Sequence, residues 1–487
     1  MKGKSIMKNK GKTFFTIIGI LLMFFSKFLP PVFGLSSLGM QIGGIFIGTI
    51  LLWMFVSVTW PSLLAIVALI LTPLYTYTEG LSASMGGWIT SFILFSSMVT
   101  WTLGQTGFLK RCALWFVTRP WAQKRPWLFL SLLFMAPLVI GSFMSPIPAF
   151  IVCLPVAEQI FNELHLKKGD RLPQIIVLGI LFFASLSTAA TPIAHTVTTL
   201  ALSLFENDMG TAVNFVSYTI FGVVSCLVTF IITIFITKYV CKLDLSQLQD
   251  LDQLQFSNES PKMSLEEKCT VAIFAVVVAM WMLPGIISPV LPDVASAISS
   301  LGTPTPAIIG VCLLALIQVN GKPLMNFGEA LSKGVPWSAV FMVAATSLLG
   351  SSLTNETVGI TAAISNLLSP VISQMPPELF VLFVSIATVI ITNLASNTVT
   401  VTLMYSISLP LVYGGAITGV NPAALSCVIG AAACVACATP PSTATAAIAA
   451  GTGWLKTDTM LKYGLLWCIV ASVVFAIIGY PIAALIM

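Results

Sequence analysis

The chain of 487 residues is 57% hydrophobic and only 8% charged, and its formal net charge is +5. Its mean hydropathy of +1.00 is far above that of soluble globular domains, which excludes a soluble enzyme. The sequence therefore predicts an all-α polytopic membrane protein that is surrounded by a lipid bilayer and has no nucleic-acid partner.

Charge-free apolar runs of about 20 residues are long enough to cross a bilayer as helices. Such runs lie near 13–30, 38–58, 61–76, 85–104, 213–237, 270–290, 303–320, 336–354 and 464–487. Three further runs, 126–157, 172–205 and 379–455, hold prolines or polar residues near their middle. Together the runs predict about 11 transmembrane helices plus two re-entrant helical hairpins.

Lysine and arginine set the topology, because they are retained on the cytoplasmic side of a membrane. With the N-terminus in the cytoplasm, all of the 22 basic residues except Lys27 fall on the cytoplasmic side. This topology predicts a C-terminus outside the cell and an integral protein of a bacterial inner membrane.

The run 126–157 cannot cross the membrane in this topology, because basic residues on the same side flank both of its ends. Two prolines within Ser145-Pro146-Ile147-Pro148 interrupt it, and proline breaks a helix by removing a donor and by steric clash. We therefore expect a hairpin over 126–160 that enters from the cytoplasm and returns. The flanking basic residues are Lys124, Arg125, Lys167, Lys168 and Arg171.

The run 379–412 has a similar length and is interrupted between Thr392 and Thr398. Its flank carries Glu378, and no basic residue follows until Lys456. By the same reasoning it predicts a second re-entrant hairpin, which enters from the outside.

The two hairpins belong to a pattern that occurs twice in opposite orientation. Ser145 and Ser396, at the two tips, are 251 positions apart, and Gly107 and Gly359 ahead of them are 252 apart. A span with a polar interruption follows each tip, at 190–196 and at 437–443. Two inverted-topology repeats with broken helices are typical of secondary transporters.

The pattern predicts four segments along the chain. They are an N-terminal cytoplasmic tail with scaffold helices (1–84), the first transport elements (85–209) with the broken helix 172–205, scaffold helices (210–332) with a cytoplasmic loop 238–268, and the second transport elements (333–487) with the hairpin 379–412 and the broken helix 423–450.

Broken helices leave backbone N–H and C=O groups without partners inside the membrane, where each must find a partner or line a site. Half-helix N-termini favour an anion, and unwound carbonyls can hold a cation. Ser396, Asn397 and Thr398 at one tip would be neutral donors to an anion, with Thr439 facing them. The alternative is that these residues only hold helices together, as polar residues often do in membranes.

The stretch Ser396-Asn397-Thr398, followed by Ala438-Thr439-Pro440-Pro441, resembles the divalent anion/sodium symporter family, whose members carry dicarboxylates, citrate or sulfate. The resemblance covers nearly the whole chain. It implies a substrate held between two hairpin tips, with sodium ions as cofactors. The substrate-binding residues that it implies are Ser145, Pro146, His195, Thr196, Ser396, Asn397, Thr398, Thr439 and Pro440.

The resemblance implies one sodium site at Thr392, Ala395, Asn397 and Ala438, and a second at Gly141, Ser145 and Ala194. The second departs from the family pattern. Ser145-Pro146-Ile147 replaces a Ser-Asn-Thr, and Ala194 replaces a glycine. We therefore expect only the site around Thr392 and Asn397 to remain effective, so that Na⁺ is replaced in part by a proton or by anion exchange.

His195 is the histidine inside an apolar run, at the interruption of the first broken span. It is either a packed neutral side chain or a partner of the substrate that carries a coupling proton, because histidine titrates near physiological pH. The second alternative predicts transport that strengthens as the pH falls through about 6–7.

The leading hypothesis is a homodimeric secondary transporter of small dianionic substrates such as succinate, malate, 2-oxoglutarate or citrate, working by cation symport or by anion exchange. The family resemblance implies an elevator movement. The alternatives are a sulfate transporter, or an exporter or antiporter of the same superfamily. A membrane-embedded enzyme is the least favoured, because no nucleophile–base pair and no metal-ligand cluster is recognisable in the sequence.

Overall fold

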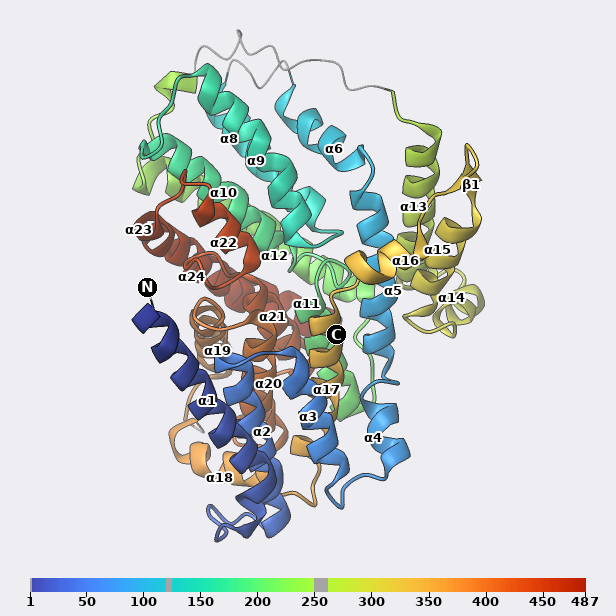
Figure 1. Cartoon of the computed structure of the whole chain (residues 1–487), viewed down its shortest axis with the longest axis vertical. Helices are drawn as coiled ribbons and strands as arrows, with labels where there is room; N and C mark the ends of the chain where they lie inside the picture. The colour runs from blue at the N-terminus through green and yellow to red at the C-terminus, as the bar shows by residue number, and fades with distance from the viewer. Residues whose placement is uncertain (1, 120–124, 249–261, 373) are drawn as a thin grey trace.

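The computed structural model describes residues 2–119, 125–248, 262–372 and 374–487 of the chain. Nearly all regular structure in them is helical, which confirms the prediction of an all-α membrane protein (Figure 1). Lys124 and residues 249–261 of the predicted loop 238–268 lie outside the described residues.

In the described part of the chain, six helices are long and apolar enough to cross a membrane. A seventh candidate is a pair of helices bent by 42°, Tyr77–Ala83 with Trp88–Gly104. Several shorter apolar helices lie between them, so the number of 11 crossings stays a prediction. The six are Gly11–Phe28, Ser37–Phe55, Phe215–Val240, Leu265–Ile287, Trp337–Thr354 and Thr457–Ile486.

The elements up to the middle of the chain are α1 (Lys2–Phe25), η1 (Ser26–Phe28), α2 (Ser37–Phe55), α3 (Thr59–Ile70), α4 (Tyr77–Ala83), α5 (Trp88–Gly104), α6 (Phe108–Val117), α8 (Pro126–Gly141), α9 (Pro146–Glu163), α10 (Arg171–Ser187), α11 (Thr196–Met209), α12 (Phe215–Phe235), η2 (Ile236–Val240) and η3 (Ser246–Leu248).

The remaining elements are α13 (Leu265–Ile287), α14 (Pro292–Ser299), α15 (Thr305–Leu316), β1 (Gln318–Val319), β2 (Lys322–Pro323), α16 (Phe327–Glu329), η5 (Ala330–Gly334), α17 (Trp337–Thr354), α18 (Ile360–Ile372), α19 (Pro377–Thr392), α20 (Asn397–Tyr413), α21 (Pro422–Cys434), α22 (Ala444–Gly451), α23 (Thr457–Thr459), η6 (Met460–Gly464), α24 (Leu465–Val474), η7 (Phe475–Gly479) and α25 (Tyr480–Ile486).

Two of the expected spans are shorter than the apolar runs that predicted them. In the run 61–76, α3 ends at Ile70, three residues ahead of Pro73, and a proline disfavours helical backbone in the residue before it. In the run 303–320, α15 ends at Leu316, and an antiparallel hairpin of β1 and β2 follows. Its turn is Asn320-Gly321, both with positive φ, as a two-residue hairpin turn requires.

The centre of the molecule is built on α10 and α21, which are buried along nearly their whole length. A helix that is apolar all round is stable only when other helices cover it on every side. Here α8 and α9 pack on α10, while α11, α19 and α20 pack on α21. Each of these two central helices therefore has a hairpin of helices packed against it, α8–α9 in one case and α19–α20 in the other.

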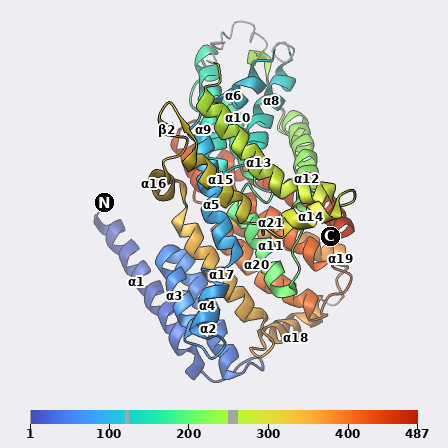
Figure 2. The same ribbon diagram turned by 90° about the vertical axis from the view of Figure 1, so that its right-hand side faces the viewer.

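The first two helices form a close pair at the periphery. A side chain at Gly48 would collide with the backbone of Gly19 at 2.6 Å, and one at Gly44 would collide with Ser26 at 2.0 Å. Such close approach through small residues is a common way of joining helices inside a membrane. This pair and α3 lie together in the lower half of the molecule, while α13 and α15 lie in its upper half (Figures 1 and 2).

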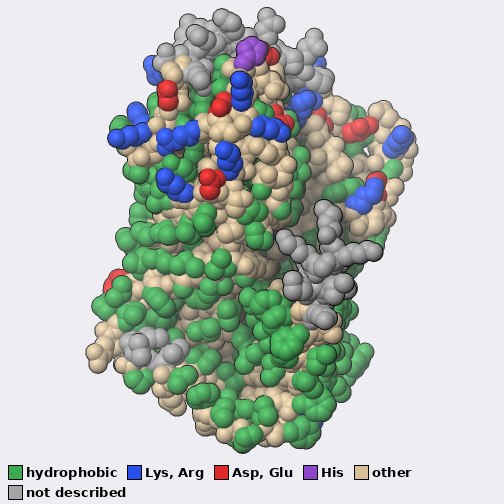
Figure 3. Space-filling model, turned by 60° about the vertical axis from the view of Figure 1, so that its left-hand side comes forward, with side chains coloured by type: hydrophobic (Ala, Val, Ile, Leu, Met, Phe, Trp, Pro, Cys, Tyr) green, Lys and Arg blue, Asp and Glu red, His purple; other side chains and the backbone are tan. Residues whose placement is uncertain are grey.

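Charged side chains are not spread evenly over the surface. On the face in Figure 3, basic and acidic side chains gather towards one end, and hydrophobic side chains cover much of the remainder. This distribution agrees with a protein whose charged end lies in water while its apolar belt contacts lipid.

Candidate functional site

The two helices of the second hairpin are separated by a short irregular tip. Helix α19 ends at Thr392 and α20 begins at Asn397. Helix α21 ends at Cys434, and an irregular segment runs from there to the start of α22 at Ala444. The tip and this segment are in direct contact through Asn393.

Asn393 joins the tip to the unwound segment through both ends of its side-chain amide. Its Oδ1 accepts the backbone N–H of Cys437 at 3.0 Å and that of Ala438 at 2.8 Å. Its Nδ2 donates to the carbonyl of Val435 at 3.1 Å and to that of Val389 at 2.8 Å. Asn393 is 2% exposed, and three of these bonds satisfy backbone groups of the unwound segment, at Val435, Cys437 and Ala438.

Two threonines complete the junction. The hydroxyl of Thr392 donates to the carbonyl of Ala433 at 2.7 Å and lies 3.0 Å from Oδ1 of Asn397. The hydroxyl of Thr439 donates to the carbonyl of Asn393 at 2.6 Å. The tip and the unwound segment are thereby fixed to one another from both sides.

Three of the four residues implied as a sodium site, Thr392, Asn397 and Ala438, lie at this junction. Thr392 and Asn397 place a hydroxyl and an amide oxygen 3.0 Å apart, and Ala438 is held beside them by Asn393. Oxygen donors of this kind suit a hard cation such as Na⁺. The side-chain oxygens of Thr392 and Asn397 therefore fit the ion, and the carbonyls of Ala395 and Ala438 would complete the expected site.

The first hairpin has a similar tip with fewer connections. Helix α8 ends at Gly141 and α9 begins at Pro146, while α10 ends at Ser187 and α11 begins at Thr196. The hydroxyl of Thr191, in the unwound segment, donates to the carbonyl of Ser142 at the tip. This bond corresponds to the one from Thr439 to Asn393 in the second half.

The described residues of the first half contain no side-chain amide that joins the tip to the unwound segment, as the clamp formed by Asn393 does in the second half. Ser142 occupies the place of Asn393, and its hydroxyl donates within its own helix to the carbonyl of Leu138 at 2.7 Å. A side chain at Gly141 would meet Oγ of Ser187 at 2.0 Å, so the glycine permits close helix packing. The proposed cation residues Gly141, Ser145 and Ala194 thus supply at most one side-chain oxygen, and they fit a sodium ion less well than the second-half set.

His195 caps the N-terminus of α11. Its Nδ1 accepts the backbone N–H of Val197 at 3.3 Å, which requires an unprotonated Nδ1 and assigns the imidazole hydrogen to Nε2. A positive charge on this ring would be placed beside the positive end of the helix dipole. The geometry therefore favours a neutral histidine that can still donate one hydrogen bond from Nε2.

A cavity of about 260 Å³ lies where the first tip and the first unwound segment meet α5 and α17. Four of the expected substrate and cation residues line it, namely Ser145, Ala194, His195 and Thr196. Hydroxyl-bearing residues of α5 line it as well, among them Ser96, Ser97 and Thr100.

The second-half residues take other positions. Ser396, Asn397, Thr398, Thr439 and Pro440 do not line this cavity. Ser396 is exposed at the N-terminus of α20, while Thr398 is 9% exposed within its first turn. Pro146 is half-buried at the start of α9 beside the cavity-lining Ser145. This cavity is therefore lined by residues of the first tip and not by those of the second.

The two unwound segments nevertheless approach one another through the centre of the molecule. The hydroxyl of Ser185 donates to the carbonyl of Ala436 at 3.4 Å, and the hydroxyl of Thr198 lies 3.3 Å from Sγ of Cys434. These bonds connect α10 and α11 of the first half with α21 and the segment after it.

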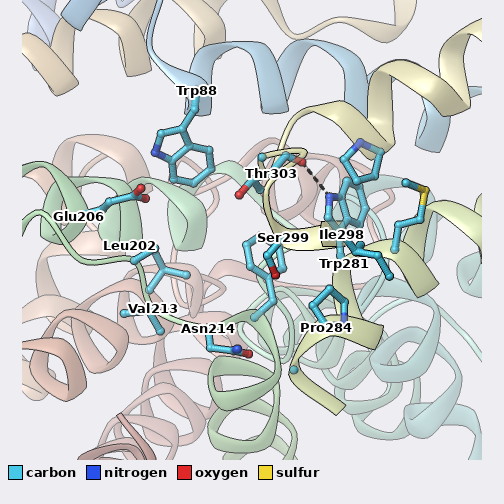
Figure 4. A pocket seen from close by; sticks show the side chains of 16 residues that line it. Trp88, Leu202, Glu206, Val213, Asn214, Trp281, Pro284, Ile298, Ser299 and Thr303 are labelled. Carbon is cyan, nitrogen blue, oxygen red and sulfur yellow. Dashed lines mark hydrogen bonds between the residues drawn. The ribbon is translucent and has the colours of Figure 1, made fainter. Parts of the chain in front are cut away.

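A second pocket, of about 280 Å³, lies between α5, α11 and α13 (Figure 4). Trp88 and Glu206 line one side, and Trp281, whose indole N–H donates to the carbonyl of Thr303 at 2.9 Å, lines the other. Phe92 lines the first cavity and contacts the rings of both tryptophans, with centroids 6.3 Å from Trp88 and 5.3 Å from Trp281. Aromatic side chains thus separate the two pockets.

Sequence reasoning missed the amide of Asn393 and the hydroxyls of α5. Asn393 stands within the polar run 392–402, but its partners lie more than 40 positions further along the chain. The serines and threonine of α5 occur in an otherwise ordinary apolar span. Only the spatial arrangement distinguishes these residues from polar residues that join helices.

The apolar helices make the chain an all-α membrane protein, and interruptions at hydrogen-bonded breaks are typical of membrane transporters. Residues 50–430 match the family model described as citrate transporter, and the chain belongs to this family. The membership confirms the resemblance to the divalent anion/sodium symporters.

Two relatives support this assignment. The chain is 25% identical over 355 residues to the sodium-dependent dicarboxylate transporter SdcS of Staphylococcus saprophyticus, a match that covers 70% of this chain and 66% of the relative, slightly under two thirds. It is 23% identical over 350 residues to an uncharacterized transporter of Methanocaldococcus jannaschii, covering 71% of this chain and 72% of the relative.

Proposed function

We propose that the protein is a secondary active transporter of small divalent organic anions, such as succinate, malate, 2-oxoglutarate or citrate. The observation that carries the proposal is that the N-termini of α9 and α11 open on one cavity, which Ser145, His195 and Thr196 line. Helix N-termini attract anions through their dipoles and their free N–H groups, of which Ile147 supplies the one among the first three residues of α9, because Pro146 and Pro148 have none. A cavity of about 260 Å³ suits a small substrate.

The polar lining supports recognition without a fixed positive charge. The residues that line the cavity include hydroxyls and one imidazole, but no lysine or arginine. Two carboxylates of a substrate would be held by N–H groups, hydroxyls and Nε2 of His195. A co-bound cation would supply the balancing charge, and the junction of Thr392, Asn397 and Ala438 is the place where we put it.

The sodium-dependent dicarboxylate transporter among the relatives supports sodium symport and a dicarboxylate substrate for this chain. In our proposal the second half binds Na⁺ at Thr392, Ala395, Asn397 and Ala438. Ser396 and Thr398 approach the substrate from the second tip when the two tips come together.

The proposed architecture is two inverted repeats, each made of a re-entrant hairpin and a broken helix. The matching bonds from Thr191 to the carbonyl of Ser142 and from Thr439 to that of Asn393 support the pairing of the halves. We propose that these elements move as an elevator against scaffold helices in 1–84 and 210–332. We also propose a homodimer in a bacterial inner membrane, with the N-terminus in the cytoplasm and the C-terminus outside.

A sulfate transporter, or an exporter of the same superfamily, is the second candidate. The cavity is small and its wall is rich in hydroxyl groups. An inorganic dianion can be bound by such neutral donors alone, so this lining favours a sulfate transporter over a membrane-embedded enzyme. Uptake of sulfate in place of dicarboxylates would distinguish it.

Uptake by the purified protein in liposomes tests the proposed function. Labelled succinate, citrate, 2-oxoglutarate and sulfate are compared with and without an inward sodium gradient, and with and without substrate inside. We expect concentrative uptake of at least one organic dianion that a sodium gradient or internal substrate drives. Liposomes that take up none of the organic dianions under any of these conditions would overturn the proposal.

A further inference from the structure

A carboxylate outside the proposed substrate site connects three helices. Asp208, near the end of α11, accepts the hydroxyl of Thr354 from α17 on Oδ1 at 2.8 Å. Its Oδ2 accepts the phenol of Tyr405 from α20, also at 2.8 Å. The phenol of Tyr405 in turn lies 3.3 Å from that of Tyr413, where either oxygen could be the donor.

No cation balances this carboxylate in the described part of the chain. The ion pairs found there join Arg111 to Glu267 and Lys333 to Glu329, away from Asp208. A partly buried carboxylate that only neutral hydroxyls stabilise retains a large part of its desolvation cost.

The other titratable groups around Asp208 are neutral or acidic. Helix α20 contributes the phenols Tyr405 and Tyr413, and α17 contributes a hydroxyl with Glu356 following two residues after its end. Helix α11 itself carries Glu206, which lines the pocket beside Trp88 of α5. Helix α21, also packed on α11, carries the thiols of Cys427 and Cys434. None of these groups supplies a positive charge that would hold Asp208 ionised.

The hydroxyl network accepts both states of the carboxyl group. When Asp208 is ionised, Tyr405 donates to Oδ2, as the structure shows. When one proton has bound to Oδ2, that oxygen becomes the donor to Tyr405, and Tyr405 can turn its own hydrogen to Tyr413. Tyr413 is half-buried next to the exposed Gly414, so the chain of hydroxyls leads from the carboxylate to the surface.

We propose that Asp208 is a binding site for a coupling proton, reached from the surface through Tyr413 and Tyr405. The inference rests on the proposed transport function, and it assigns a proton as a cation that accompanies the substrate. Protonation converts a charge-assisted bond between α11 and α20 into a neutral one of roughly half the strength. It thereby loosens α20, the second hairpin arm, from α11 and α17.

The test compares wild type with Asp208→Asn in liposomes that hold a pH-sensitive dye. In wild type we expect succinate entry to acidify the interior, and uptake to rise as the outside pH falls from about 8 to about 5. Asp208→Asn should lose both responses. The matched control Glu206→Gln, which changes a carboxylate two residues away on the same helix, should keep them. At each pH all variants are offered the same protonation states of succinate. Protonation of the substrate therefore cannot produce a difference in pH response between Asp208→Asn and the other proteins.

Infrared spectroscopy of the detergent-purified protein gives a readout that needs no transport. Lowering the pH should produce the carbonyl band of a protonated carboxylic acid that is missing in Asp208→Asn. Tyr405→Phe keeps the carboxylate of Asp208 and removes one hydrogen-bond donor to its charged form, so this band should appear at higher pH. This variant provides the test if Asp208→Asn does not fold.

The two proposals fail in different ways. If wild type transports no dianion, the proposed function is wrong, while the infrared band still decides whether Asp208 binds a proton. If Asp208→Asn keeps the pH response of uptake, or if Tyr405→Phe leaves the band unchanged, Asp208 is a structural hydrogen-bond acceptor and the proton site is wrong.

Discussion

The side-chain oxygen of Asn393 lies 2.8 Å from the backbone nitrogen of Ala438, whose N–H it accepts. This bond joins the tip of the second hairpin to the unwound segment of the second broken helix, two parts of the chain that are 45 positions apart. The amide holds the segment together with the bonds from Thr439 to Asn393 and from Ser185 to Ala436. The cation-binding residues of the proposed site are held in place by the same contact.

The Asn393 clamp can be tested with Asn393→Ser, which places in the second half the residue type found at Ser142 in the first. The N–H groups of Cys437 and Ala438 would lose their acceptor, at a cost of about 1–3 kcal/mol for each unsatisfied group. We expect uptake of the substrate to fall at least about tenfold while the protein still assembles. Asn421→Ser is the control, because Asn421 caps α21 and serine caps equally well. Equal uptake by Asn393→Ser and wild type would contradict this role.

The proposed sodium site can be tested with Thr392→Val, which keeps the size of the side chain and removes one oxygen. We expect the sodium concentration for half-maximal uptake to rise about tenfold, the effect of losing a contact of about 1.4 kcal/mol. Thr388→Val is the matched control, because the buried hydroxyl of Thr388 donates within α19 to the carbonyl of Val384. The assignment is wrong if the two variants show the same sodium dependence.

His195 should act as a neutral donor, since its Nδ1 is used by the N–H of Val197. We expect His195→Gln to lower the uptake rate through loss of this cap and of the Nε2 donor, and to keep the pH profile of wild type. His165→Gln, at the other histidine, controls for general effects of the substitution. A flattened pH profile in His195→Gln alone would show instead that this histidine carries the coupling proton.

Asp208 also predicts a pH dependence of stability. It lies beyond the end of the predicted span 172–205, and burial raises its pKa from 3.8 to about 6, against the opposing hydrogen bonds from Thr354 and Tyr405. The folded protein therefore binds more protons than the unfolded chain between these values, and its stability falls as the pH rises through about 6. Measured by the unfolding temperature in detergent, Asp208→Asn should lack this fall, a difference of about 2–4 °C. An equal fall in both proteins would contradict the shifted pKa.

The helix breaks could be predicted from the sequence because each has a local cause. The prolines at 146 and 148 and the polar residues at 392–398 interrupt apolar runs, and the helix breaks lie at 142–145, directly before Pro146, and at 393–396. The clamp formed by Asn393 and the cavity-lining hydroxyl groups of α5 have no such local signal, because the residues that they face come from distant parts of the chain. The family resemblance implies one site between the two tips, which stays a prediction; the structure adds a cavity at the first tip and a hydrogen-bonded junction at the second.

The central claim is that a divalent organic anion binds in the cavity lined by Ser145, His195 and Thr196. The most direct measurement is the rate at which a small thiol reagent modifies Ser145→Cys, with the exposed Cys312 replaced by serine, in the presence and absence of substrate. We expect succinate or citrate to slow this modification and to leave unchanged the rate at Ser299→Cys, which lies in the second pocket. A rate at Ser145→Cys that is the same with and without succinate, citrate and 2-oxoglutarate would contradict the assignment of this cavity.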